Sequence, residues 1–264
     1  MSSPGTLYAW IERLPEDGRY AFSRRDAEGV TDASDAAIKM TLYRLKKSGG
    51  IVSPRRDFFV VVPREYRSAG SPPASWFIDD LMRHRGRRYY VGLLSAAALH
   101  GAGHQQPMAF QVITDAVERA VEVGRVRVEF HVSNLVEGAA TERVQTETGT
   151  MVVSTPETTA FDMVRFPASC GHWNNVATVL SELADKIDPD ELVAGADRVA
   201  RSDVQRLGWL LDLVGESTLA DALAKKLAGE RLLPTPLTSA RDSTDAPLDA
   251  RWRVLVNDEV EPDL

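Results

Sequence analysis

The sequence predicts an α+β protein: an N-terminal winged helix-turn-helix domain, then a larger mixed α+β domain with a helical C-terminal half. Three observations support this fold class. Short segments with helical apolar spacing precede a run of alternating apolar residues near the N-terminus, strand patterns dominate the middle of the chain, and helical spacing returns after residue 156. The Pro-, Ser- and Gly-rich stretch 63–75 has a linker composition, so we predict domains at residues 1–67 and 68–264.

Charge is divided unevenly along the chain. The 264 residues carry a net charge of −7, but residues 1–91 hold 16 basic and 11 acidic residues, a balance of +5. The remainder therefore carries −12, which argues against a broad nucleic-acid contact there. A single cysteine, no signal-peptide pattern in the first ten residues and no apolar run of membrane-spanning length predict a cytoplasmic protein without a membrane partner.

The first 50 residues predict three helices. Residues 6–14 place apolar side chains at helical spacing. Ser23 is a candidate cap for a short helix that Gly29 ends, and Ser34 is a candidate cap for a longer helix that extends to about Ser48. Paired glycines follow the longer helix and favour a turn there.

The longer helix predicts one buried and one exposed face. At 100° per residue, Ile38, Leu42 and Leu45 form one apolar stripe. The other side holds Ala36, Lys39, Met40, Tyr43 and Lys47.

A β-hairpin is predicted directly after this helix. Residues 51–62 divide into two strands around a turn at residues 53–57, whose tip is Pro54-Arg55-Arg56. Helix, short helix, turn, longer helix and basic-tipped hairpin is the order typical of a winged helix-turn-helix. In that architecture the longer helix enters the major groove and the hairpin lies along the adjacent backbone.

Segment 34–62 supports this interpretation through its charge. It holds six basic and two acidic residues, a net charge of +4 within an acidic chain, which favours a polyanionic partner. The alternative is a solvated basic helix beside an ordinary surface hairpin. The predicted partner is double-stranded DNA, and the candidate DNA-binding residues are Ser34, Lys39, Tyr43, Lys46, Lys47, Arg55 and Arg56.

These candidates have different expected roles. Lys39, Tyr43 and Lys47 are placed on the groove-facing side, Ser34 and Lys46 near phosphates at the helix ends, and Arg55 with Arg56 at the backbone or minor groove. Two alternatives remain open here. Tyr43 is also compatible with a half-buried position against the hairpin, and Lys46 with simple compensation of the helix dipole.

The second domain begins with a predicted helix at residues 75–82. The basic stretch "RHRGRRYY" follows, either as a solvated loop, which is slightly favoured, or as a further backbone contact. Strands are predicted for AFQVIT and RVRVEFHVS, and a hairpin for VQTETGTMVVS with its turn near residues 147–149. Ser154 or Thr155 is expected to cap the next helix, and helices are predicted at 175–187, 189–200, 202–214 and 218–228.

Catalytic, metal and cofactor sites are not predicted. His100 and His104 are four residues apart, but Gly101 and Gly103 lie between them where a helix should end. No local feature lowers the pKa of Cys170, and no glycine-rich phosphate loop is present. Glu157 and Asp162 could form an acid pair, but Pro156 beside Glu157 favours a helix start.

Several stretches resemble one known family. "YYVGLLSAAALHG" (Tyr89–Gly101), "STPETTAFDMV" (Ser154–Val164) and "QRLGWLLDLVG" (Gln205–Gly215) are similar to segments of the AbiEi family, and "RWRVLVN" (Arg251–Asn257) resembles its closing strand. AbiEi proteins are antitoxins of abortive-infection, type IV toxin–antitoxin systems. The resemblance covers roughly residues 7–257, most of the chain.

The resemblance implies an autoregulating repressor, and because the sequence holds no catalytic constellation we expect no enzymatic activity. Its N-terminal domain would bind inverted repeats in its own promoter, and its C-terminal domain would counter a nucleotidyltransferase toxin without a stable complex. Two other function classes stay open on the residues. One is a ligand-responsive winged-helix regulator without a toxin partner, and the other is a nuclease or transferase with an N-terminal DNA-binding domain.

Overall fold

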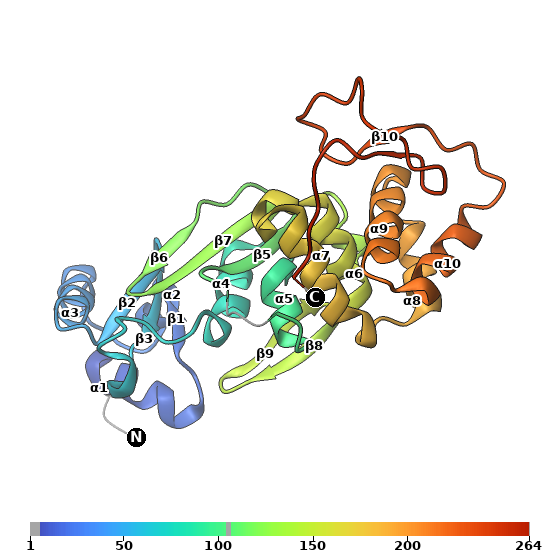
Figure 1. Cartoon of the computed structure of the whole chain (residues 1–264). Coiled ribbons are helices and arrows are strands. Elements are labelled where there is room, and N and C mark those ends of the chain that lie inside the picture. The colour runs from blue at the N-terminus through green and yellow to red at the C-terminus, as the bar shows by residue number, and fades with distance from the viewer. Residues whose placement is uncertain (1–5, 104–106, 264) are drawn as a thin grey trace. The chain divides into compact units, whose positions relative to one another are not determined.

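A computed structural model describes residues 6–103 and 107–263 of the chain, and its fold is α+β, as predicted (Figure 1). Its contacts define two compact units. The first contains residues up to 90, 108–133 and 143–152, and the second contains residues 91–107, 134–142 and 153–264. These units divide the chain differently from the predicted boundary after residue 67.

The first unit starts with three helices and a three-stranded antiparallel sheet. The helices are α1 Leu7–Arg13, α2 Arg24–Gly29 and α3 Asp35–Lys47. The strands are β1 Ala21–Ser23, β2 Ile51–Arg55 and β3 Phe58–Val61, in the order β1-β3-β2. All three predicted N-terminal helices are confirmed. β1 is not among the predicted strands, and it becomes one because it pairs with β3 on the side opposite to β2.

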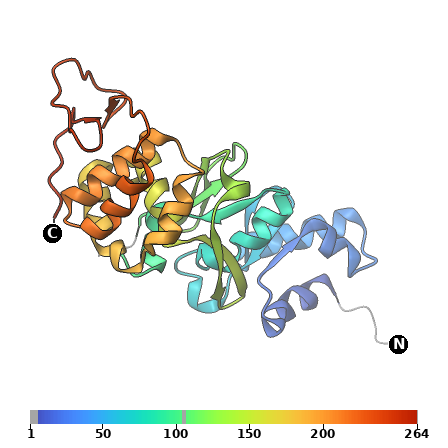
Figure 2. The ribbon, with the colours of Figure 1, turned by 90° about the vertical axis from the view of Figure 1, so that its right-hand side faces the viewer.

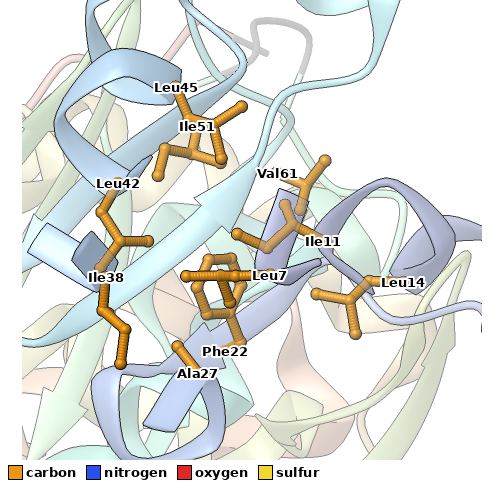
Figure 3. Packing of buried hydrophobic residues seen from close by; sticks show 10 residues of the cluster. All are labelled: Leu7, Ile11, Leu14, Phe22, Ala27, Ile38, Leu42, Leu45, Ile51 and Val61. Atoms are coloured by element: carbon orange, nitrogen blue, oxygen red, sulfur yellow. The ribbon is translucent and has the colours of Figure 1, made fainter. Parts of the chain in front are cut away.

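Apolar side chains from all of these elements meet in one core, drawn in Figure 3. The predicted stripe of α3, Ile38, Leu42 and Leu45, is buried, which confirms the assignment of its faces. The stripe packs with residues of α1, the strands and α2. The ten members shown are Leu7, Ile11, Leu14, Phe22, Ala27, Ile38, Leu42, Leu45, Ile51 and Val61.

The hairpin turn is tighter than predicted. β2 continues through Arg55, so residues 53–55 belong to the strand and the tip is Arg56-Asp57, with Asp57 at φ 58°. Pro54 is tolerated because β2 is an edge strand and its register shifts between Val52 and Arg55. The prediction of a turn at 53–57 was therefore wrong, and Arg55 is a strand residue.

The first unit continues with helix α4 Ile78–Arg85, preceded by a short 3₁₀ helix at Ala74–Trp76. The predicted helix at 75–82 is thus displaced by about one turn. Further strands are β5 Phe110–Thr114, β6 Val121–Val123 and β7 Val126–Val132, where β5 pairs in parallel with β7 and β6 pairs antiparallel with it. With β4 Tyr89–Val91, β8 Thr141–Thr146 and β9 Gly149–Ser154, they form a six-stranded sheet in the order β6-β7-β5-β4-β9-β8.

Contacts also join the N-terminal helices and three-stranded sheet of the first unit to its later segments. β2 lies against β6, as Figure 1 shows. The backbone N–H of Arg125 donates to the carbonyl of Ala69 at 2.8 Å, and a Cβ on Gly124 would lie 2.2 Å from that oxygen. This close approach requires glycine at position 124.

The second unit is mainly helical (Figure 2). It contains α5 Leu93–Leu99, α6 Pro156–Arg165, α7 His172–Leu183, α8 Pro189–Ala196, α9 Arg201–Leu213 and α10 Ser217–Lys226. Thr155 caps α6 through its side chain, as one of the two predicted capping residues. The predicted helices of this half are confirmed, with ends displaced by up to four residues.

A short parallel strand pair, β10 Thr235–Pro236 and β11 Val254–Leu255, closes the second unit. The indole of Trp252 is buried over Gly208 of α9, and it donates to Asp212 Oδ2 at 2.6 Å. The Gln205 amide donates to the carbonyl of Trp252 at 2.7 Å. Two of the four stretches that resemble AbiEi segments, Gln205–Gly215 and Arg251–Asn257, therefore pack on each other.

No helix among the described residues is long and apolar enough to cross a membrane.

Candidate nucleic-acid interface

The exposed side of α3 carries the predicted groove-facing residues. Lys39, Tyr43 and Lys47 are all exposed, as are Arg44 and Lys46. The Tyr43 side chain is 60% exposed, so it does not occupy the half-buried position that was the alternative. The structure therefore brings the predicted helix residues onto one continuous solvent-facing surface.

Local capping fixes both ends of α3. The Ser34 hydroxyl accepts a hydrogen bond from the Ala37 N–H at 3.3 Å, which satisfies one of the free N–H groups of the first turn. At the other end the chain reverses at Gly49, which has φ 71°. The Gly50 N–H then donates to the Leu45 carbonyl at 2.8 Å. Ser34 thus has a structural role in addition to the phosphate contact predicted for it.

Helix α3 carries far more positive than negative charge. Its one acidic residue, Asp35, forms an ion pair with Arg24 at the start of α2. Lys39, Arg44, Lys46 and Lys47 supply four positive charges on the exposed surface. Three of these lie in the last turn, where cations are also favoured by the helix dipole. Lys46 therefore compensates the helix dipole, and its exposed side chain stays a candidate for the predicted phosphate contact.

The two arginines of the hairpin have different environments. Arg56 projects from the tip with its side chain 96% exposed, and its Nε lies 3.4 Å from Asp57 Oδ2. Arg55 is instead held within the protein by hydrogen bonds to the carbonyls of Arg119 and Ala120, and it lies over the Phe130 ring. The extra residue of strand β2 explains the difference, because it directs Arg55 toward β6 and leaves only Arg56 at the tip.

A buried carboxylate gathers three arginines beside the hairpin. Glu118, only 4% exposed, accepts from Arg85 at 3.0 Å and from Arg87 at 3.4 Å, and its second oxygen lies 3.9 Å from Arg55. Burial lowers the pKa of the Arg55 guanidinium, and Arg85 and Arg119 lower it further while Glu118 opposes the shift. We call Arg55, Arg85, Arg87 and Glu118 the Glu118 cluster.

Sequence reasoning did not find this cluster. The "RHRGRR" stretch contains Arg85 and Arg87 and was noted as basic, but the favoured interpretation of it was a solvated loop. The αL conformation of Gly86, φ 63°, ends α4 and lets Arg85 and Arg87 converge on Glu118. The partner lies 31 residues or more away in sequence, and no local pattern connects the two segments.

The first unit also contains a polar cleft of about 640 Å³. Side chains of β1, α2, α4 and the β8–β9 hairpin line it, among them Asp26, Trp76, Asp79 and Arg143. Tyr89 donates to Asp79 at 2.9 Å, and burial together with Asp79 raises the pKa of this phenol. We call this the α4 cleft.

The residues considered for catalysis are buried or form hydrogen bonds and ion pairs within the fold. Burial raises the pKa of the Cys170 thiol to about 12, so it is not a thiolate at neutral pH. Glu157 accepts from the Asp188 N–H at 2.9 Å, and Asp162 pairs with Arg165 at 3.0 Å. His104 lies outside the described residues, and within the described part no three His, Cys, Asp or Glu side chains group as metal ligands.

Comparisons with known proteins give one structural neighbour and one match to a family model. The chain is similar to the crystal structure of the RV2827C protein from Mycobacterium tuberculosis, with a TM-score of 0.68 and 18% identity, covering 96% of this chain and 92% of that one. At this identity the likeness establishes a shared α+β fold. Residues 90–213 match the family model of the AbiEi antitoxin C-terminal domain. This match supports the resemblance to the AbiEi family that the sequence predicted. No match was found among curated proteins.

Proposed function

We propose that this protein is a DNA-binding transcriptional repressor of the antitoxin type. It binds inverted repeats in its own promoter and counters a nucleotidyltransferase toxin without forming a stable complex with it. The family match supports the antitoxin role, and the exposed basic surface of α3 is the observation that supports DNA binding. Cytoplasmic location and the absence of enzymatic activity are parts of the same proposal.

The N-terminal elements support a winged helix-turn-helix. α2 and α3 are joined by a short turn, α3 is the longer helix with an exposed basic face, and β2–β3 form the wing. In this arrangement α3 enters the major groove, where Lys39 and Tyr43 face base edges. Lys47 lies on the same groove-facing side, and Lys46 and Arg56 meet phosphates, as does the solvent-facing N-terminal turn at Ser34.

The structure changes the expected role of Arg55. Because its guanidinium is held by Glu118 and two backbone carbonyls, we now propose it as the anchor of the wing, while Arg56 makes the wing-tip contact. The proposed domain boundary after residue 67 is kept only as the limit of the DNA-binding elements.

The test compares two variants on two duplexes, the region upstream of the gene and a scrambled duplex of equal length. Lys39→Ala with Tyr43→Ala is expected to weaken binding mainly to the upstream duplex, by about 1–3 kcal/mol for each base edge that the helix no longer reads. Arg56→Ala is expected to weaken both duplexes nearly alike, because a wing-tip guanidinium meets phosphates. Fluorescence anisotropy titrations give both affinities, and circular dichroism checks folding.

The specificity ratio decides the docking. The ratio of the affinities for the upstream and scrambled duplexes is the specificity ratio. If Arg56→Ala changes this ratio while Lys39→Ala with Tyr43→Ala leaves it unaltered, α3 does not read the groove. If the unmodified protein protects no site upstream of its gene in a footprinting experiment, the repressor proposal fails.

The α4 cleft favours one second candidate, a ligand-responsive winged-helix regulator. Its volume suits a small polar molecule, and residues of α2 and the wing strand line it together with α4. The neighbouring gene distinguishes the candidates. A nucleotidyltransferase gene beside this one favours the antitoxin, whereas an operon of metabolic genes favours the regulator.

A further inference from the structure

We propose that the Glu118 cluster is a second phosphate-binding surface, which extends the contact with the same DNA duplex beyond the wing onto the end of α4. This inference rests on the proposed function and names residues outside the N-terminal elements. The partner is the sugar–phosphate backbone of double-stranded DNA.

The first argument is the charge balance. Arg55, Arg85 and Arg87 share the carboxylate of Glu118, and arginine stays protonated in proteins, so the four side chains together carry +2. Like charges held this close repel one another, and partial burial removes the water that would screen them. A phosphate group brought to the cluster compensates the excess positive charge.

The second argument is accessibility. Glu118 is buried, but the side chains of Arg85 and Arg87 are 40% and 38% exposed. Each guanidinium has five N–H donors in a planar fork, and the bonds to Glu118 use only part of them. Glu118 therefore orients the two guanidinium groups, and their remaining donors are available to phosphate oxygens.

The third argument is continuity with the wing. Arg55 of the cluster is adjacent in sequence to Arg56 at the wing tip, and the Nε2 atom of His84 lies 3.3 Å from the Arg56 carbonyl oxygen. The wing turn therefore contacts the end of α4 that supplies Arg85. A duplex whose backbone lies along the wing tip continues onto Arg85 and Arg87.

The experiment measures the salt dependence of binding to the upstream and scrambled duplexes. Each phosphate contact contributes about −0.9 to the slope of log K against log salt. For Arg85→Gln with Arg87→Gln, we expect the slope to become shallower by about 1–2 on both duplexes. An unchanged slope in this folded variant would overturn the inference.

Two controls separate charge from stability. Glu118→Gln breaks the same ion pairs but keeps both arginines, so its slope should not become shallower. If the slope of Glu118→Gln becomes as shallow as that of Arg85→Gln with Arg87→Gln, disrupted structure explains the effect and the inference fails. Arg198→Gln with Arg231→Gln removes two exposed positive charges outside the cluster and should leave the slope unchanged. An equally shallow slope in this pair would show a non-specific effect of net charge and would also overturn the inference.

The outcomes distinguish this inference from the proposed function. If the unmodified protein binds neither duplex, both are wrong. If the unmodified protein binds, and the variant Arg85→Gln with Arg87→Gln shows the same slope of log K against log salt, only the second phosphate-binding surface is wrong. Should the arginine pair fail to fold, Arg87→Gln alone decides, with an expected change of about 1 in the slope.

Discussion

Single residues control how closely segments of this protein approach each other. Gly208 lies in the middle of α9, where glycine weakens a helix, yet a Cβ at this position would lie 2.2 Å from the Trp252 ring. The indole is buried there and hydrogen-bonded to Asp212. Position 208 therefore has to be glycine for the C-terminal strand pair to close on α9.

Gly208→Ala is expected to destabilise the second unit by about 1–3 kcal/mol, because the indole must move out of a well-packed position. Urea unfolding followed by tryptophan fluorescence measures this change. Gly138→Ala is the matched control, since no atom lies within 4 Å of a Cβ at that position. Equal effects of the two substitutions would contradict the packing of Trp252 over Gly208.

At the scale of elements, α3 is held by one face and leaves the other to solvent. Ile38, Leu42 and Leu45 bury the apolar stripe, and the caps at Ser34 and Gly49 fix its length. Stability and the proposed recognition therefore depend on different residues of the same helix. Substitutions on the two faces are expected to separate the two properties.

Leu42→Ala is expected to lower the stability of the N-terminal elements by about 2–5 kcal/mol, because it removes a buried side chain and leaves a cavity. Met40→Ala, on the exposed face, is expected to change stability by less than about 0.5 kcal/mol. Thermal unfolding of each variant by circular dichroism makes the comparison. A similar decrease for both would mean that α3 is not oriented as described.

At the scale of the whole molecule, the N-terminal elements have their own core but are tied to later segments of the first unit. All ten core residues of Figure 3 lie between Leu7 and Val61. Arg55 to Glu118, Phe58 to His84 and Tyr20 to Trp76 are contacts that cross residue 67.

A fragment of residues 1–67 is therefore expected to fold with a cooperative thermal transition, but at a lower temperature than the same elements in the full chain. Removing Glu118 also frees Arg55, so DNA binding by the fragment should be weaker. Circular dichroism and the anisotropy titration measure the two effects. A fragment without a thermal transition would show that residues 1–67 are not an independent domain.

The sequence by itself determined the features that depend on local spacing. The three N-terminal helices, the serine caps of α2 and α3, the buried stripe of α3 and the helical C-terminal half all follow from periodicity and capping over short stretches of the chain. The AbiEi resemblance was likewise visible in short segments.

Only the tertiary structure decided which side chains remain available for a partner. Arg55 and Arg56 are equivalent in sequence, but a register shift in β2 directs Arg55 to Glu118 and leaves Arg56 in solvent. Glu118 and the arginines it gathers come from segments far apart in the chain. Local patterns carry no information about such pairs, because burial and charge pairing are set by the packing of the whole unit.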